Sequence, residues 1–321
     1  MKPVTFAPTI IEHAASLIGC TPSEAGQSAE LMAKAHIEAF HRYRHPVVTV
    51  GMDVYNIEAE SLGCEVRFYN DASIPGIVTH PYTIDSDPGL IRFSSDSGRT
   101  GMILEAAAAV KKDIGSETNV SIGISGPFSI LIELLGLDAA VDFLVEDDER
   151  IIHFLDAILE YQKNYCDMII VNGLGVTIFD SWASPPITSP RIYREYAAPY
   201  EREVISHLKS SGLASRPLVI GGDTRLIADD ILNTGTTLLV SDYNTPLPLY
   251  AEKARSHDVI LRVNIDPKRI WGDDWEYVNN RINEIYSVLD FHPKTIIGTG
   301  VMPYDTPPEY ILRIKDLIES L

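Results

Sequence analysis

The fold of this chain is best approached from the stretch Arg216-Pro-Leu-Val-Ile-Gly-Gly-Asp-Thr224. Its apolar residues 217–220 are too few for a core helix and are bounded by glycines, a pattern typical of a strand buried on both faces. Gly221 and Gly222 then allow a tight turn, and Asp223 or Thr224 can cap a following helix. The stretch therefore predicts one βα unit of a parallel sheet, although a structural turn alone would explain it equally well.

Similar units are expected along the rest of the chain. The predicted strands end near residues 52, 68 (or 78), 126, 172, 221, 241, 264 and 298. Eight βα units without a long break favour a (β/α)8 TIM barrel, with a doubly wound sheet as the alternative. No linker or internal repeat divides the chain. We therefore expect one barrel domain over residues 1–321, with an N-terminal helical extension, residues 1–45, packing on the barrel.

Cap signals predict where several helices begin. Thr21-Pro-Ser-Glu24 and Thr306-Pro-Pro-Glu309 both have the pattern of a capping box with an early proline. A short helix is expected over residues 8–19. Residues 70–98 are rich in Asp, Ser, Pro and Gly and are expected to form an extended excursion.

Composition narrows the class of protein. The 321 residues include 45% hydrophobic side chains and carry a net charge of −19. This charge argues against binding to nucleic acid phosphates or to an anionic membrane surface. No apolar run approaches the roughly 20 residues that span a bilayer. The N-terminal segment does not resemble a signal peptide, so we expect a cytoplasmic protein.

Polar residues follow many of the predicted strands. In a TIM barrel the active site lies on the loops that follow the strands, so these residues are expected to share one mouth. The loops contain, among others, Asp53, Gly126-Pro-Phe128, Asp180, Gly221-Gly-Asp223, Asp242 with Asn244, Asn264 with Asp266, and the segment from Gly298 to Met302. Asn172 is expected at the end of a strand over residues 167–172.

Three segments resemble a known superfamily. Residues 180–200, which open with Asp180-Ser-Trp, and residues 300–310 resemble the acidic loop and the closing loop of the uroporphyrinogen decarboxylase superfamily. Residues 54–63, with Ile77-Val-Thr-His-Pro81, look closer to its corrinoid-dependent methyltransferase branch. The resemblance covers most of the chain from about residue 46 and implies a TIM barrel, in agreement with the strand count.

Two departures from the family patterns narrow the function. The Arg-Gln-x-Gly-Arg-Tyr segment of the decarboxylases is missing. The thiol-methylating branch carries His-x-Cys-Gly after the fifth strand and a further Cys in the closing loop, where this chain has residues 219–222 (Val-Ile-Gly-Gly), Gly300 and Val301. We therefore expect no zinc. Cys20, Cys64 and Cys166 are too widely spaced to indicate a zinc site or a disulfide framework.

Loss of zinc favours an amine acceptor over a thiol. Zinc turns a thiol into a thiolate near neutral pH, whereas an amine already has its lone pair. The resemblance thus implies transfer of a methyl group from a methylated corrinoid (methylcobalamin on a separate corrinoid protein) to N5 of tetrahydrofolate. Asp180 and Asp223 are the expected catalytic carboxylates, with helix capping as their competing role. Substrate contacts are expected from Asn172, Asp180, Gly221, Gly222, Asp223, Asp242, Asn244, Asn264 and Met302.

Other functions stay open at this point. A decarboxylase would need arginines at the mouth, for which Arg191, Arg225 and Arg262 are the candidates. A zinc-type corrinoid:thiol methyltransferase, acting on a thiol like coenzyme M, is a further alternative. A degenerate barrel that only binds a corrinoid protein is the non-enzyme alternative. A homodimer is left open.

Overall fold

Eight parallel strands form the centre of the molecule, which is described by a computed structural model covering residues 4–185, 187–289 and 292–321. They form two four-stranded arcs, in the orders β2-β5-β6-β7 and β8-β9-β10-β1. The strands are β1 Phe6–Thr9, β2 Val47–Val50, β5 Asn119–Ser125, β6 Gly175–Phe179, β7 Leu218–Val219, β8 Leu238–Ser241, β9 Ile260–Ile265 and β10 Thr295–Val301. A hydrogen bond of 3.2 Å from Thr237 N to Arg216 O links the segments that lead into β8 and β7. The arcs follow chain order, so the predicted barrel is confirmed.

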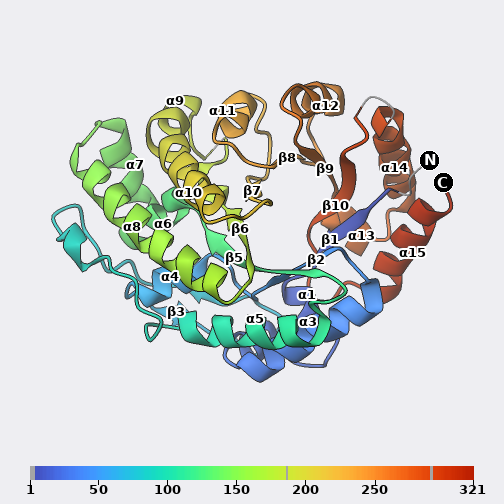
Figure 1. Ribbon diagram of the computed structural model, residues 1–321, viewed down its shortest axis with the longest axis horizontal. Coiled ribbons are helices and arrows are strands. Elements are labelled where there is room, and N and C mark those ends of the chain that lie inside the picture. The colour runs from blue at the N-terminus through green and yellow to red at the C-terminus, as the bar shows by residue number, and fades with distance from the viewer. Residues whose placement is uncertain (1–3, 186, 290–291) are drawn as a thin grey trace.

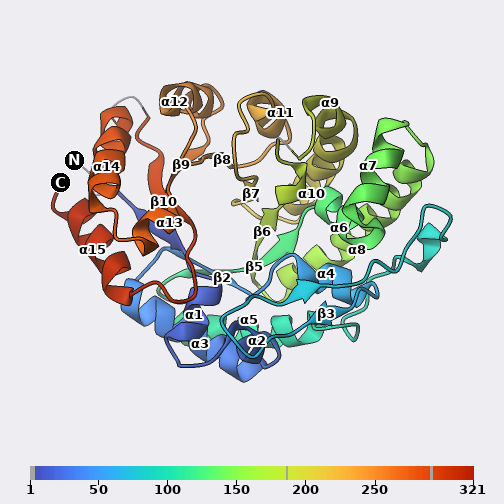
Figure 2. The same ribbon diagram turned by 180° about the vertical axis from the view of Figure 1, so that it is seen from behind.

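Helices surround the strands, as Figures 1 and 2 show from opposite sides. They are α1 Glu12–Ser16, α2 Pro22–Gly26, α3 Ala29–Tyr43, α4 Asn56–Ser61, α5 Thr100–Ile114, α6 Pro127–Leu135, α7 Leu137–Val145, α8 Arg150–Val171, α9 Pro190–Ile192, α10 Ala198–Ser210, α11 Ala228–Asn233, α12 Leu247–Ser256, α13 Pro267–Trp271, α14 Trp275–Leu289 and α15 Pro308–Glu319. Short 3-10 turns lie at Pro88–Leu90 (η1) and Ser181–Ala183 (η2), and Tyr193–Ala197 (η3) is a π-helical segment. Within the described ranges, no helix is both long and apolar enough to cross a membrane.

The core lies between the strands and the surrounding helices. In β5 every residue after Asn119 is buried, and Ile122 and Ile124 are fully shielded from solvent. A continuous apolar run of this kind is what a strand covered on both faces requires. The helices supply the outer half of the core, since α5 and α8 each bury one apolar face, including Val110 and Ile158.

The N-terminal segment differs from the prediction. Residues 8–19 were expected to be helical. Helix α1, Glu12–Ser16, lies within this range, but Phe6–Thr9 form β1, which pairs with β10 through Phe6 and Ile297, and Ala7 and Gly298. In the described chain β1 pairs with one strand, β10, and so lies at the edge of its arc. Proline has no backbone N–H, and a strand at an edge tolerates the loss of that donor at Pro8. The barrel therefore begins before residue 45, and α1 to α3 are the helical part of its first βα unit.

One predicted barrel strand forms outside the barrel, and another was predicted in the wrong place. The strand expected to end near residue 68 or 78 is a small antiparallel pair outside the barrel, β3 Val66–Arg67 with β4 Gly76–Ile77. Residues 167–171 continue α8, because Tyr165, Cys166 and Ile169 are buried with helical spacing. The barrel strand follows at Gly175–Phe179.

The cap predictions have mixed outcomes. At Thr21 the capping box is confirmed: its Oγ1 accepts from Glu24 N at 3.1 Å, and its own N donates to Glu24 Oε2 at 2.8 Å. At Thr306 the prediction is wrong, since α15 begins at Pro308 without a side-chain cap. The helix expected directly after Thr224 is also displaced, because α11 begins at Ala228.

Candidate active site

Three of the predicted residues meet where β7, β8 and β9 end. The Asp242 carboxylate accepts from Gly222 N at 2.8 Å and from the Asn264 amide at 3.3 Å. Gly222 has φ +77°, a backbone region that favours glycine. Asp242 and Asn264 are both buried, each 7% exposed. Because each oxygen of Asp242 already has a donor, the carboxylate ties the three loops together.

Arg262 continues this network into the barrel. Its Nε donates to Asn264 Oδ1 at 3.0 Å, and one terminal nitrogen donates to Thr9 Oγ1 and to the Ala7 carbonyl, both at 2.8 Å. A side chain at Gly298 would collide with the guanidinium, so glycine makes room for it. Burial lowers the pKa of Arg262 to about 10. These hydrogen bonds link Arg262 of β9 to β1 inside the barrel.

Asp180 lies beneath the mouth and is fully buried. Its Oδ1 accepts from Ser129 N at 2.8 Å and from Ser129 Oγ at 2.6 Å, in the first turn of α6. Burial raises the pKa of Asp180 to about 6. Burial, together with the nearby Asp180 carboxylate, also holds the pKa of the neighbouring Glu201 well above its usual range. The geometry gives Asp180 the capping role; its predicted catalytic role stays a prediction.

The other predicted carboxylate, Asp223, lies at the rim. Its side chain is 39% exposed and both oxygens accept from Arg225, with Nε at 2.8 and 2.9 Å. Arg225 lowers the pKa of Asp223. Asn244 is exposed in the next loop, and Met302 is fully buried after β10.

Asn172 is not at the mouth. It caps the C-terminus of α8, and its Nδ2 donates to Met168 O at 2.8 Å. Since Asn172 precedes β6 instead of following it, it belongs to the opposite end of the barrel. The expectation that it contacts substrate rested on a strand that the structure does not contain, and is corrected here.

A cleft of about 580 Å³ lies among the loops that follow β2, β5 and β6. Its lining combines aromatic and aliphatic walls with a few polar groups: Tyr55, Asn56, Gly76, Ile77, His80, Ile132, Glu133, Leu137, Ser181, Trp182 and Ile187. At one wall the Tyr55 and Ser181 hydroxyls are 2.5 Å apart. Burial raises the pKa of Tyr55 to about 12, so the phenol keeps its proton. A cavity of this size and lining is typical of a small-molecule site.

Glu133 is the carboxylate of this cleft. Trp182 Nε1 donates to its Oε1 at 2.8 Å, and His80 Nδ1 donates to its backbone carbonyl at 2.7 Å. Burial raises the pKa of Glu133, and the Trp182 hydrogen bond opposes this. The sequence analysis missed Glu133 because it lies inside α6 instead of after a strand. A lone acidic residue in the apolar run of residues 127–135 was the available signal.

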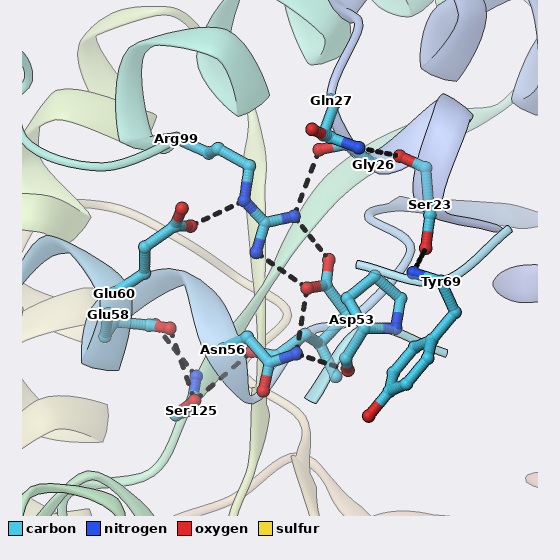
Figure 3. A network of polar contacts seen from close by, with 12 residues as sticks. Ser23, Gly26, Gln27, Asp53, Asn56, Glu58, Glu60, Tyr69, Arg99 and Ser125 are labelled. Carbon is cyan, nitrogen blue, oxygen red and sulfur yellow. Dashed lines mark hydrogen bonds and ion pairs between the residues drawn. The ribbon is translucent and has the colours of Figure 1, made fainter. Parts of the chain in front are cut away.

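An ion-pair network supports the floor beside the cleft (Figure 3). Arg99 donates to both oxygens of Asp53, at 2.9 and 2.7 Å, and its Nε lies 2.5 Å from Glu60 Oε2. The Asn56 amide donates to Asp53 Oδ2 at 2.9 Å and to Pro75 O at 2.7 Å. Both hydrogens of the amide are therefore used, which leaves its oxygen as an acceptor at the cleft wall.

The residues at the zinc positions of the thiol branch do not fit a metal. Val219, Gly221 and Val301 carry no donor side chain. Across the described parts of the chain, no three His, Cys, Asp or Glu side chains are grouped so that they could hold an ion. The three cysteines are buried and free, and burial raises the pKa of Cys64 to about 12.

Comparison with known proteins gives the family. The model of the uroporphyrinogen decarboxylase (URO-D) family matches residues 2–321, so the chain belongs to this family. The methylcobamide:CoM methyltransferase MtbA of Methanosarcina mazei is 28% identical over 271 residues, covering 83% of this chain and 78% of that protein. The uroporphyrinogen decarboxylase of Chlorobaculum parvum is 25% identical over 283 residues, covering 84% and 74%. The resemblance to this superfamily and its methyltransferase branch is confirmed.

Solved structures agree with the fold. A methyltransferase from Methanosarcina mazei superposes with a TM-score of 0.83 over 100% of this chain and 94% of that chain, at 18% identity. A putative vitamin-B12 independent methionine synthase from Listeria monocytogenes gives a TM-score of 0.57 at 13% identity. These superpositions support the barrel fold. At identities of 18% and 13% they do not identify the substrate, which is argued from the site.

Proposed function

We propose that this protein transfers a methyl group from a methylated corrinoid, carried by a separate protein, to N5 of tetrahydrofolate. The relatives named methylcobamide:CoM methyltransferase support the corrinoid donor. One observation distinguishes the acceptor: the ends of β7 and β10 carry Val219, Gly221 and Val301 where the thiol branch has zinc ligands. Without a metal to form the thiolate, an amine is the better acceptor.

The proposed step balances without a further reactant. The lone pair of N5 attacks the methyl carbon, and the cobalt–carbon bond breaks with its electron pair staying on cobalt. Cobalt is thereby reduced from the trivalent to the monovalent state, and the proton of N5 passes to a base or to water. The protein contributes alignment of the two reactants and an acceptor for that proton.

The residues at the mouth have separate parts in this proposal. Asp242, with Gly222 and Asn264, fixes the shape of the loops that face the reactants. Asp223 is the proposed proton acceptor, because its carboxylate is partly exposed at the rim and is kept ionised by Arg225. A side chain added at Gly221 would meet only Asp242, so the backbone of this loop stays accessible beside the reactants.

The test is to incubate the protein with methylcobalamin and each candidate acceptor and to follow loss of the cobalt–methyl absorbance. We expect tetrahydrofolate to give methyltetrahydrofolate, while coenzyme M and other thiols react more slowly. We also expect metal analysis of the purified protein to find less than one zinc per chain. Zinc-dependent methylation of a thiol, with tetrahydrofolate inert, would move the protein to the thiol branch of its relatives. Decarboxylation of a porphyrinogen would move it to the other branch.

A further inference from the structure

The cleft contains a carboxylate oxygen without a hydrogen-bond donor. Glu133 Oε1 accepts from Trp182, but in the described chain no group donates to Oε2. The indole fixes the carboxylate, and its hydrogen bond opposes the rise in the pKa of Glu133 that burial causes. A partly buried carboxylate with one free oxygen is an acceptor for N–H groups of a ligand.

Nearby polar groups complete a pattern suited to a nitrogen heterocycle. Asn56 has both amide hydrogens engaged, so its oxygen is a second acceptor. The hydroxyls of Tyr55 and Ser181 bond to each other, and one of the two hydrogens remains available as a donor. Apart from the His80 imidazole, which donates to the Glu133 carbonyl, the remaining side chains of the lining are apolar or aromatic, which favours a flat ring over a flexible chain.

The mouth offers no equivalent site for an N–H edge. Asp242 already has a donor on each oxygen, Asp180 is fully buried, and Asp223 is paired with Arg225. None of these three carboxylates lines the cleft, and Asp180 is shielded from solvent altogether. Glu133 can accept from a ligand while it keeps its hydrogen bond to Trp182.

We infer that Glu133, held by Trp182, accepts the N–H groups of the pyrimidine edge of the methyl acceptor and so selects a 2-amino-4-oxo pterin in this cleft. The inference rests on the proposed function and assigns its acceptor site to the loops after β2, β5 and β6. The 2-amino group and the neighbouring ring N–H meet the carboxylate, as in other charge-assisted pairs. The carbonyl of the same ring can accept from the Tyr55–Ser181 hydroxyl pair.

The test compares Glu133→Gln with the unaltered protein. Glutamine keeps an oxygen for Trp182 but replaces the acceptor for the ligand by an amide donor. We expect calorimetry to show tetrahydrofolate binding weakened roughly 10- to 100-fold, the range of a lost charge-assisted hydrogen bond. Asp138→Asn is the matched control. It neutralises an exposed carboxylate at the start of α7, outside the cleft lining, and should leave binding unchanged.

A second ligand separates recognition from a structural effect. An analogue in which a methyl group replaces the 2-amino group should bind the unaltered protein roughly tenfold more weakly than tetrahydrofolate. Glu133→Gln should bind the two ligands nearly equally. Suppose that the unaltered protein binds tetrahydrofolate and that Glu133→Gln prefers tetrahydrofolate over the analogue by the same factor as the unaltered protein. The role of Glu133 is then overturned, and the proposed function stands. If the unaltered protein neither binds nor methylates tetrahydrofolate, the proposed function itself fails.

Discussion

Three aspartates that follow barrel strands have three different environments. Asp180 is buried and accepts from the first turn of α6, Asp242 joins neighbouring loops, and Asp223 is paired with Arg225 at the rim. Their positions after strands predicted that all three would lie near the mouth. Their partners could not be predicted, because each partner except Arg225 is distant in the sequence and is brought close by the barrel.

Replacing Asp223 by Asn tests whether this carboxylate takes part in the reaction. The structure removes the competing explanation, since α11 begins at Ala228 and Asp223 does not cap it. An exposed ion pair contributes about 0–1 kcal/mol, so the melting temperature should change little. We expect kcat for methyl transfer to tetrahydrofolate to fall by roughly 10- to 100-fold as the proton acceptor is lost.

The control for that variant is Asp258→Asn. Asp258 is also an exposed aspartate, paired with Lys294 at 2.6 Å, but it precedes β9 and so lies at the other end of the barrel. It should lose neither stability nor rate beyond the error of measurement. A folded Asp223→Asn protein with an unaltered kcat would show that the carboxylate is dispensable.

At the scale of secondary structure, the sequence predicted elements whose apolar pattern is unambiguous. The strands at Leu218–Val219 and Leu238–Ser241 were expected in these places. The errors arose where patterns overlap. The apolar run at the end of α8 fits a short strand as well as a helical face, and tertiary packing decides between them. The first strand was missed because four residues before a helix carry little periodic signal.

The junction between β5 and α6 depends on a glycine. A side chain at Gly126 would overlap the Asp180 carboxylate, which accepts from Ser129 N and Oγ. We expect Gly126→Ala to displace Asp180 and to reduce the free energy of unfolding by roughly 2–4 kcal/mol, as for other disrupted buried polar networks. Chemical denaturation measures this change.

Gly76→Ala provides the comparison for that variant. Gly76 has open space around the position of an added methyl group and does not have a positive φ. The substitution should change the free energy of unfolding by less than about 1 kcal/mol. Equal losses in the two alanine variants would mean that Asp180 moves aside without cost, and that the glycine is not required for this contact.

Across the whole molecule, buried carboxyl groups gather on the segments that follow strands. Burial raises the pKa of Glu12, after β1, to about 7, that of Glu58, after β2, to about 8, and that of Asp180, after β6, to about 6. Each group therefore keeps its proton to a higher pH in the folded protein than in the unfolded chain, where the proton is released near pH 4. In this protein of net charge −19, the buried carboxyl groups therefore lower the free energy of unfolding as the pH rises. Carboxylates in surface ion pairs, whose pKa values are lowered, have the opposite effect.

Glu58 gives the clearest test of this dependence. It is fully buried, accepts from Ser125 N at 2.8 Å and from Ser125 Oγ at 3.2 Å, and has its pKa raised from 4.5 to about 8 mainly by burial (Figure 3). The neutral acid is therefore the form that the fold favours. Its contribution to stability is fully present below pH 4.5 and is lost as the pH rises through 8.

Glu58→Gln should remove this loss, because glutamine has a similar shape, can still accept from Ser125 and does not ionise. We expect the variant and the unaltered protein to unfold in urea with similar free energies near pH 4.5. Above pH 7 the variant should be the more stable one by a few kcal/mol at most, since one pKa unit corresponds to about 1.4 kcal/mol. Glu65→Gln, which removes an exposed carboxylate just beyond α4, should show no such divergence. A difference between Glu58→Gln and the unaltered protein that stayed constant with pH would instead reflect packing, and Glu58 would then be ionised throughout in the folded protein.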